Sequence, residues 1–503
     1  MNLESPLLYE VNARCWLGEL GAEAGRPTGL GEVPESELDR WCEAGFSHIW
    51  LMGVWKTDPR SREQALQDPF VRRRADEALP GWRESDLAGS PYAIGEYNVP
   101  EEMGGNEGLA RLRRRLNERG LKLILDFVPN HVGLSHSWLQ FWPELFVPGT
   151  LGSQDAFMSQ GRDGEHWVAH GKDPYFPSWT DTAQLDFRRA ETHQAMQETL
   201  QLVADQCDGV RCDMAMLVLR DVFEQTWSKA PFADTPTEQQ FWSHAIPAVK
   251  ERHPGFIFLA EVYWDLEREL QQLGFDYTYD KWLYDHLRNG NGSEARKQLR
   301  AVDREFLARS VHFLENHDEP RAARVFSPPE YRAALTLICG LPGMRLFHYG
   351  QLEGARIDHP IQLARRSIEA PDEEIAGCVQ WLLRIIGTTS IGRGDWKHLT
   401  PFPAWSTNKS HEHVILMQWT AGSDRFELVV VNLSSEEAQC FAHPEISGLA
   451  AHDWRMCDLI GVQDYVREGR DMVNRGLYLA LEPHAAHIFH FRPAEERDKP
   501  AQG

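Results

Sequence analysis

Short apolar runs alternate with longer amphipathic stretches up to about residue 390 of this chain. Apolar runs of about four to eight residues are typical of buried strands, and apolar residues that recur every three or four positions are typical of helices. Strands that alternate with helices indicate βαβ units and a parallel sheet. The expected strands are SHIWLMGV (47–54), LKLILDFV (121–128), CDGVRCDM (207–214), FIFLAEV (256–262) and VHFLENHD (311–318), with helices between them such as 106–120 and 190–206.

Several of these runs end in a polar cluster: DFVPNH, RCDM, AEVYW and ENHDEPR. In a (β/α)8 barrel the C-terminal ends of the strands lie on one face, and the catalytic groups come from those ends. Each cluster alone could be a strand-end cap, a helix cap or a metal ligand set. Four clusters in order at the same end of successive strands instead favour one converging site on a barrel.

Two regions depart from the alternation. Residues 133–186 are rich in Gly, Pro, Trp and Phe, and a loop of that length in a compact domain is usually functional or a small inserted subdomain. From about residue 395 the runs become strand-like with little helical periodicity, which predicts an antiparallel β-sandwich. The expected domains are a barrel at 1–132 and 187–394, an inserted domain at 133–186 over the barrel mouth, and a C-terminal β domain at 395–503.

Charge and cysteine usage narrow the class of partner. The formal net charge is −23, which argues against nucleic acid or an anionic membrane as a partner. The eight cysteines form no Cys-x-x-Cys pair, so we expect neither a disulfide scaffold nor a cysteine metal site. The first residues show no signal-peptide pattern, and no apolar run approaches the roughly 18 residues of a membrane span. We therefore expect a cytoplasmic protein.

The stretch DGVRCDMAM places Arg211 and Asp213 two residues apart in an expected strand. Side chains two apart in a strand point to the same face. A buried charged pair is costly to desolvate and is weak evidence for stability. By itself the pair is equally well explained as a structural ion pair or as part of a site, and the other strand-end acids favour the site.

The strand ends together offer Asp126, Asp213, Glu261 and Asp318. On this architecture, paired carboxylates suit glycoside hydrolysis, in which a retaining enzyme needs a nucleophile and an acid about 5–5.5 Å apart. A third acid can hold the sugar hydroxyls, and an adjacent arginine keeps the nucleophile ionised. Arg211 would then hold Asp213 charged and oriented.

The pattern resembles the α-amylase family of glycoside hydrolases. LYEVNARCW is similar to the first barrel strand of that family, and GSPYAIGEYNV (89–99) to the loop that follows its second strand. DFVPNH, GVRCD, the glutamate of LAEVYW and FLENHD match its four signature regions in order. The resemblance covers most of the chain and implies a (β/α)8 TIM barrel with a short inserted domain after strand 3 and a C-terminal β-sandwich.

The resemblance also implies a role for each matching residue. Asp213 would be the nucleophile, Glu261 the general acid/base and Asp318 the stabiliser of the transition state. Four residues would contact the sugar or brace the nucleophile: Tyr92 would stack on the sugar, His131 and His317 would hydrogen-bond to it, and Arg211 would brace Asp213. Asp126 and Asn130 would support the site. Asn130 matches a calcium-binding position of many family members, but without clear partner ligands we expect no metal and no cofactor.

The resemblance leaves the exact reaction open. Met214, Ala215 and Met216 follow the nucleophile position, where glucan-cleaving members often have Lys-His, so endo-cleavage of starch is in doubt. The stretches 269–287 and 343–366 are loosely similar to intracellular bacterial members, including glucan maltosyltransferases. The expected substrate is an oligosaccharide or glucan with α-glucosidic bonds. Transglycosylation is the main alternative; a non-catalytic carbohydrate-binding relative and a metal-dependent hydrolase are less favoured.

Overall fold

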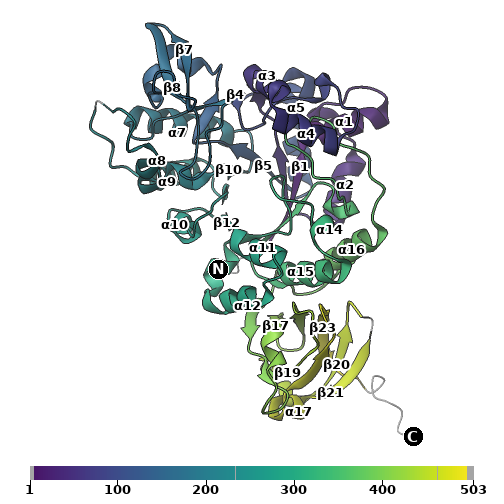
Figure 1. The fold of residues 1–503 in the computed structure, drawn as a ribbon. Helices are drawn as coiled ribbons and strands as arrows, with labels where there is room; N and C mark the ends of the chain where they lie inside the picture. The colour runs from purple at the N-terminus through teal and green to yellow at the C-terminus, as the bar shows by residue number, and fades with distance from the viewer. Residues whose placement is uncertain (1–4, 233, 462, 496–503) are drawn as a thin grey trace.

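The computed structural model describes residues 5–232, 234–461 and 463–495. Within these ranges, eight parallel strands close into a barrel in the order β1-β14-β13-β12-β11-β10-β5-β2. In the view of Figure 1, β1 and β5 lie between α5 and α11. The (β/α)8 barrel predicted from the sequence is confirmed. The strands are β1 (Leu7–Asn12), β2 (His48–Met52), β5 (Lys122–Phe127), β10 (Gly209–Cys212), β11 (Ile257–Ala260), β12 (Tyr277–Tyr279), β13 (Ser310–His312) and β14 (Met344–His348).

Helices surround the barrel because each carries one apolar face. In α5, for example, Leu109, Leu112 and Leu116 are buried and lie on the same side of the helix, as the spacing of apolar residues predicts. The barrel helices are α1 (Ala13–Ala24), α2 (Glu35–Glu43), α5 (Gly105–Glu118), α7 (Ala190–Ala204), α8 (Arg220–Trp227), α9 (Phe241–Arg252), α10 (Glu267–Gln272), α11 (Lys281–Arg288), α12 (Gly292–Ala301), α13 (Arg304–Ala308), α14 (Ala322–Val325), α15 (Pro328–Gly340) and α16 (Glu373–Thr388).

The observed strands are shorter than the expected ones, and the difference is greatest for the last of them. The run 311–318 was expected to be a strand to its end, but β13 stops at His312. Phe313 and Leu314 remain buried, because they pack against the core without joining the hydrogen-bonded ladder. Asp318 therefore stands on a loop beyond the strand end.

Two excursions rise above the C-terminal ends of the strands. The one after β2 carries β3 (Lys56–Thr57), α3 (Pro59–Gln67), α4 (Pro69–Ala78) and β4 (Ile94–Glu96). The one after β5 carries β6 (His131–Gly133), α6 (Ser137–Phe141), β7 (Ala156–Gly161), β8 (Gly164–Ala169) and β9 (Thr182–Gln184). The second excursion pairs β6 with β9 and β7 with β8. It occupies the region expected to be an inserted domain, whose limits at 133 and 186 stay a prediction.

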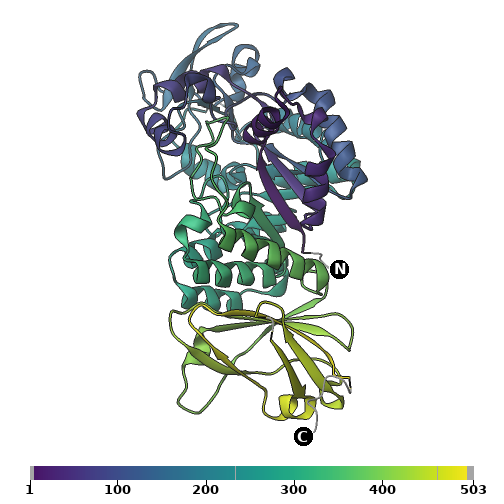
Figure 2. The ribbon, with the colours of Figure 1, turned by 90° about the vertical axis from the view of Figure 1, so that its right-hand side faces the viewer.

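Two antiparallel sheets follow the barrel, in the orders β15-β17-β18-β23-β20-β21 and β16-β19-β22. Figure 2 shows them below the helices of the barrel. A separate hydrophobic core draws residues from both sheets, including Leu416, Leu428, Cys440 and Leu479, as a sandwich requires. The elements are β15 (Asp395–Leu399), β16 (Phe402–Pro403), β17 (Val414–Thr420), β18 (Phe426–Asn432), β19 (Ala438–Ala442), β20 (Asp453–Asp458), β21 (Asp464–Glu468), α17 (Gly469–Asn474), β22 (Leu477–Leu481) and β23 (Ala486–Pro493).

All eight cysteines are free thiols, in agreement with the absence of a disulfide pattern in the sequence. In the described part of the chain, no helix combines the length and apolar character that crossing a membrane requires.

Candidate active site

Arg211 joins two carboxylates at the centre of the barrel mouth. Its Nη1 donates to Asp213 Oδ1 at 2.6 Å, and its Nη2 donates to Glu261 Oε2 at 2.7 Å. Arg211 stands on β10, with Asp213 one residue past its end, and Glu261 directly follows the neighbouring strand β11. Because the two nitrogens belong to one rigid guanidinium, the carboxyl groups of Asp213 and Glu261 are held side by side.

Aromatic rings surround the guanidinium of Arg211, which is fully buried. Its carbon lies 5.2 Å from the ring centre of Trp50, 5.1 Å from that of Tyr92 and 5.9 Å from that of Tyr279. Cation–π contacts of this kind, together with the two ion pairs, offset the cost of burying the charge. The charge of Arg211 is therefore fixed in place between the acids.

Glu261 is bonded on both carboxyl oxygens. Oε2 accepts from Arg211 and from the backbone N–H of Met214 at 2.7 Å, and Oε1 accepts from the Tyr263 hydroxyl at 2.7 Å. Burial raises the pKa of Glu261 to about 7, against the opposing effect of Arg211. Burial also raises the pKa of Asp213, again opposed by Arg211.

The bond from Met214 depends on an unusual backbone conformation. Met214 has a φ of 41°, in the left-handed region that side-chain-bearing residues rarely adopt. Strain of this kind persists only where the surrounding structure enforces it and is concentrated at functional sites. Here it turns the N–H that follows Asp213 toward Glu261.

Glu10, His317 and Asp318 form a second charged group beside the first. His317 Nδ1 lies 2.5 Å from Glu10 Oε1, and Nε2 lies 3.0 Å from Asp318 Oδ2 and 2.8 Å from the Tyr92 hydroxyl. Burial alone would lower the pKa of His317, but Asp318 and Glu10 raise it well above its usual range. Burial acts to raise the pKa of Asp318, but His317 outweighs it and lowers the pKa to about 2.

The three acids of the site differ in the exposed fraction of their side chains. The Asp318 side chain is 42 % exposed, while those of Asp213 and Glu261 are 9 % and 5 % exposed. Tyr92 stacks on the His317 ring, with ring centres 5.4 Å apart. The arrangement places an ionised, accessible carboxylate next to two buried ones.

The predicted supporting residues lie behind these groups. Asp126 accepts from Trp50 Nε1 at 3.2 Å and from the Gly53 N–H at 3.3 Å, and it lies 3.8 Å from Arg211. Burial raises the pKa of Asp126 to about 7. His131 packs against the Trp179 ring, and burial lowers its pKa to about 4, so it is neutral near pH 7.

Asn130, one of the predicted supporting residues, is hydrogen-bonded to Gln184. Its side-chain nitrogen donates to Gln184 Oε1, and its side-chain oxygen accepts from Gln184 Nε2 at 2.9 Å. Both polar atoms of the amide are therefore engaged within the protein. Over the described residues, no cluster of three or more His, Cys, Asp or Glu side chains is arranged to hold a metal ion.

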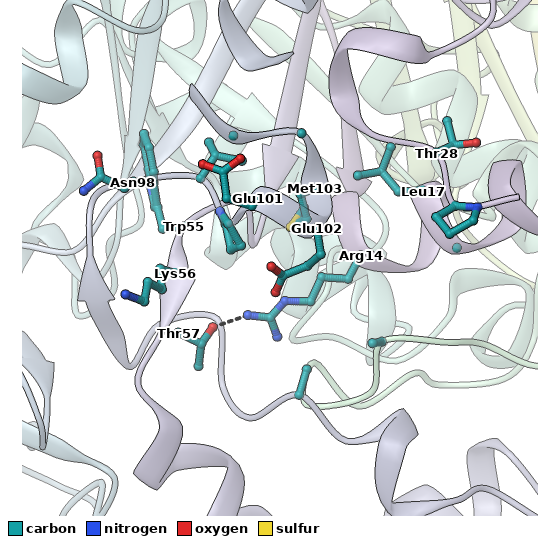
Figure 3. Close-up of a pocket in the computed structure, with 18 of the residues that line it drawn as sticks. Arg14, Leu17, Thr28, Trp55, Lys56, Thr57, Asn98, Glu101, Glu102 and Met103 are labelled. Atoms are coloured by element: carbon teal, nitrogen blue, oxygen red, sulfur yellow. Dashed lines mark hydrogen bonds between the residues drawn. The ribbon is translucent and has the colours of Figure 1, made fainter. Parts of the chain in front are cut away.

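A large cavity lies away from the paired acids. Its volume is about 1420 Å³, and its lining includes Arg14, Trp55, Lys56, Glu101 and Glu102 (Figure 3). Arg14 donates there to the Thr57 hydroxyl and to the Gly89 carbonyl. A smaller cavity of about 80 Å³ adjoins His317 and Asp318. Convergent acids with perturbed pKa values indicate a catalytic site, so we place the site at Asp213, Glu261 and Asp318, and the smaller cavity adjoins it at His317 and Asp318.

The structure thus brings Asp213, Glu261, Asp318, Arg211, His317 and Tyr92 together, with Asp126 behind Arg211. Sequence reasoning missed Glu10 and Tyr263. Glu10 could have been noticed as the one charged residue inside the otherwise apolar strand LLYEVN. Tyr263 had no such signal, because a tyrosine two residues after an acid is unremarkable.

The comparisons with known proteins all lead to the same family. The family model for the α-amylase catalytic domain matches residues 36–374. The α-amylase MalA of Haloarcula japonica is 23% identical over 360 residues, which cover 70% of this chain and 45% of that protein. The 4-α-glucanotransferase of Thermotoga maritima is 23% identical over 288 residues, covering 52% and 59%. The chain thus spans less than two thirds of the length of either relative.

Among solved structures, the maltogenic α-amylase AmyB of Thermotoga neapolitana superimposes with a TM-score of 0.67 at 20% identity. The match covers 98% of this chain and 100% of that one. At this level of identity the likeness concerns the fold, which includes both the barrel and the C-terminal sheets.

Proposed function

The chain belongs to the α-amylase family, and from that premise we propose that it is a retaining glycosidase acting on α-glucosidic bonds of oligosaccharides or glucans. The observation that carries the proposal is the sharing of Arg211 by Asp213 and Glu261. Retention requires a nucleophile and an acid close enough to act on the same bond, and one guanidinium that bonds both supplies that closeness.

In the first step, Asp213 attacks the anomeric carbon and forms a covalent bond to the sugar. The bond from that carbon to the glycosidic oxygen breaks, and the departing oxygen takes a proton from Glu261. Two donors hold Glu261 Oε2, so the proton belongs on Oε1, the oxygen that faces the Tyr263 hydroxyl. A pKa of about 7 keeps a large share of Glu261 protonated near neutral pH, as a general acid requires.

In the second step, the roles of the proton carriers reverse. Glu261, now a carboxylate, removes a proton from water, and the water oxygen replaces Asp213 at the anomeric carbon. Asp318 and His317 would hold sugar hydroxyls, since Asp318 is ionised and accessible. Tyr92 would stack on the ring of the sugar, and His131 would hydrogen-bond to it as a neutral imidazole.

Transglycosylation is the second candidate, and one feature favours it. Tyr175 of the excursion after β5 meets Trp264, three residues after Glu261, with ring centres 5.0 Å apart. Paired aromatic rings beside the general acid could hold an acceptor sugar by stacking. An acceptor bound there would compete with water in the second step. The cytoplasmic location expected from the sequence stays a prediction.

Product analysis tests the proposal. Purified protein is incubated with maltose, maltotriose, maltoheptaose and soluble glucan, with and without excess acceptor sugar, beside the nearly isosteric variant Asp213→Asn. Shorter sugars formed only by the unsubstituted protein would support hydrolysis, and longer or new sugars would support transfer. Turnover by Asp213→Asn at near-normal rates would contradict the role of Asp213.

A further inference from the structure

Two long segments meet above the barrel next to Asp318. Residues 53–93 follow β2, and residues 349–372 follow β14, and these strands flank β1 in the barrel. A small hydrophobic cluster, separate from the main core, joins them. Its buried members are Ala75, Ala78, Leu79, Leu87 and Leu363, and its half-buried members are Leu66, Val71, Trp82 and Ile357. We call the joined segments the donor wall.

Hydrogen bonds join the two segments of the donor wall to each other. Leu87 and Leu363 form an antiparallel bridge, with Ala88 N–H donating to the Gln362 carbonyl at 2.8 Å. Arg365 pairs with Asp86 at 2.9 Å. Buried apolar contacts combined with paired backbone groups are what distinguishes a fixed element from a mobile loop.

Arg321 anchors the donor wall to the rim of the site. The backbone N–H of Arg321 donates to Asp358 Oδ1 at 2.8 Å, and its Nε donates to the Ile357 carbonyl at 3.2 Å. Its Nη1 bonds the buried Glu315 at 2.8 Å. Asp358 also pairs with Arg324. The wall is thereby held against the loop that carries His317 and Asp318.

The cavity between the wall and the site is small. Arg74, Asp358 and His359 of the wall line it together with His317 and Asp318, and its volume is about 80 Å³. A water molecule occupies about 30 Å³ of liquid, and ligand pockets commonly measure about 300–1,000 Å³. The space that the wall leaves beside His317 and Asp318 is therefore well below the size of a pocket that holds a whole sugar.

The wall stands on the side opposite the leaving group. The leaving group departs toward Glu261, and Trp264, three residues further along the chain, packs against Tyr175. In the barrel order, β12 and β13 separate β11 from β14, β1 and β2. The segments of the wall therefore lie on the far side of Asp318 from Glu261. The donor part of the bound glucan must extend on that side.

We propose that the site accepts only the non-reducing end of a glucan or oligosaccharide and binds one glucosyl unit on the donor side. The inference rests on the proposed function and names its substrate class. A terminal unit carries a free hydroxyl where an interior unit carries the next linkage. Arg74 forms no ion pair with any described residue, so its guanidinium is available to donate to that hydroxyl.

Two substrates that differ only at the chain end test the inference. Maltoheptaose labelled with a fluorophore at its reducing end is compared with the same compound whose terminal 4- and 6-hydroxyls are blocked by an ethylidene group. We expect glucose to be removed unit by unit from the free compound, and the blocked compound to react at least about 100-fold more slowly, because its end cannot enter the cavity.

The outcomes separate the two proposals. Comparable cleavage of both compounds, or first products from the middle of the chain, would overturn end recognition and leave the glycosidase intact. No cleavage or transfer with either compound would overturn the proposed function and the inference with it.

Arg74→Ala examines the wall directly, and Arg73→Ala is the matched control. Arg73 lies on the same helix, is exposed, lies over the Phe70 ring and does not line the cavity. We expect Arg74→Ala to raise the relative rate on the blocked compound by about tenfold, as loss of one contact and opening of the cavity would do, and Arg73→Ala to leave the ratio unchanged. If Arg74→Ala leaves both the ratio of the two rates and the thermal unfolding unchanged, Arg74 does not recognise the chain end.

Discussion

Tyr263→Phe removes a single hydroxyl that donates to Glu261 Oε1 at 2.7 Å. A donor to a carboxylate stabilises the charged form and therefore lowers the pKa of the acid. The Tyr263 hydroxyl acts on Glu261 in this direction, against burial, which raises the pKa to about 7. Its removal should raise the pKa further, so that Glu261 keeps its proton to higher pH.

The size of the shift follows from the strength of the bond. Hydrogen bonds to charged groups contribute about 1.5–3 kcal/mol, and one pKa unit corresponds to about 1.36 kcal/mol. The pKa of Glu261 should therefore rise by about one to two units. In the pH dependence of kcat/KM, the basic limb reports the essential acid of the free enzyme, and it should move to about pH 8–9.

The assay is the initial rate on an accepted oligosaccharide between pH 4 and pH 10. Tyr478→Phe is the control, because Tyr478 lies on the exposed face of β22 in the C-terminal sheets. A basic limb that stays in place in Tyr263→Phe, or moves to lower pH, would refute Glu261 as the acid that Tyr263 tunes.

Three further substitutions have defined outcomes. Glu10→Gln should lower the pKa of His317, which Asp318 and Glu10 raise against the effect of burial. A histidine whose pKa is raised by folding stabilises the fold at pH values below its unfolded pKa of about 6.5, and this stabilisation is lost as pH rises through the folded pKa. The free energy of unfolding of Glu10→Gln should therefore fall further below that of the unsubstituted protein at pH 6 than at pH 9, as measured by denaturation. Arg211→Lys should lower kcat by about 100-fold, since a single ammonium cannot bond two carboxylates in a fixed fork; rates within threefold would contradict the shared-arginine geometry. Leu363→Ala should lower the free energy of unfolding in urea by about 2 kcal/mol, because Leu363 is fully buried in a small cluster; an unchanged midpoint would show that the donor wall adds no stability.

Much of the site was predictable from the sequence because its residues follow strands. Asp213 and Glu261 come within one residue of strands whose apolar runs are easily identified. The excursions were harder. Residues 53–93 carry two short helices whose apolar residues form a small cluster with Ile357 and Leu363, and such a distant partner is visible only in three dimensions.

Two barrel strands also escaped notice, for different reasons. β12 has three residues, too few for a periodicity to be recognised. β14 lies in GMRLFHYG, where Arg345 interrupts the apolar run. The contribution of Glu10 depends on its distance to His317, more than 300 positions later, and no local pattern records such a contact.

Trapping the covalent intermediate tests most directly whether Asp213 is the nucleophile of a retaining reaction. A 5-fluoroglucosyl fluoride carries an activated leaving group and a ring fluorine that slows both steps, so that the second step can be made limiting. After incubation, mass spectrometry of the intact protein and of its peptides locates any attached sugar. If Asp213 is the nucleophile, we expect one fluoroglucosyl group, bound to the peptide that contains Asp213 and absent from Asp213→Asn. A sugar bound to another residue, or turnover with an inverted first product and no adduct, would contradict it.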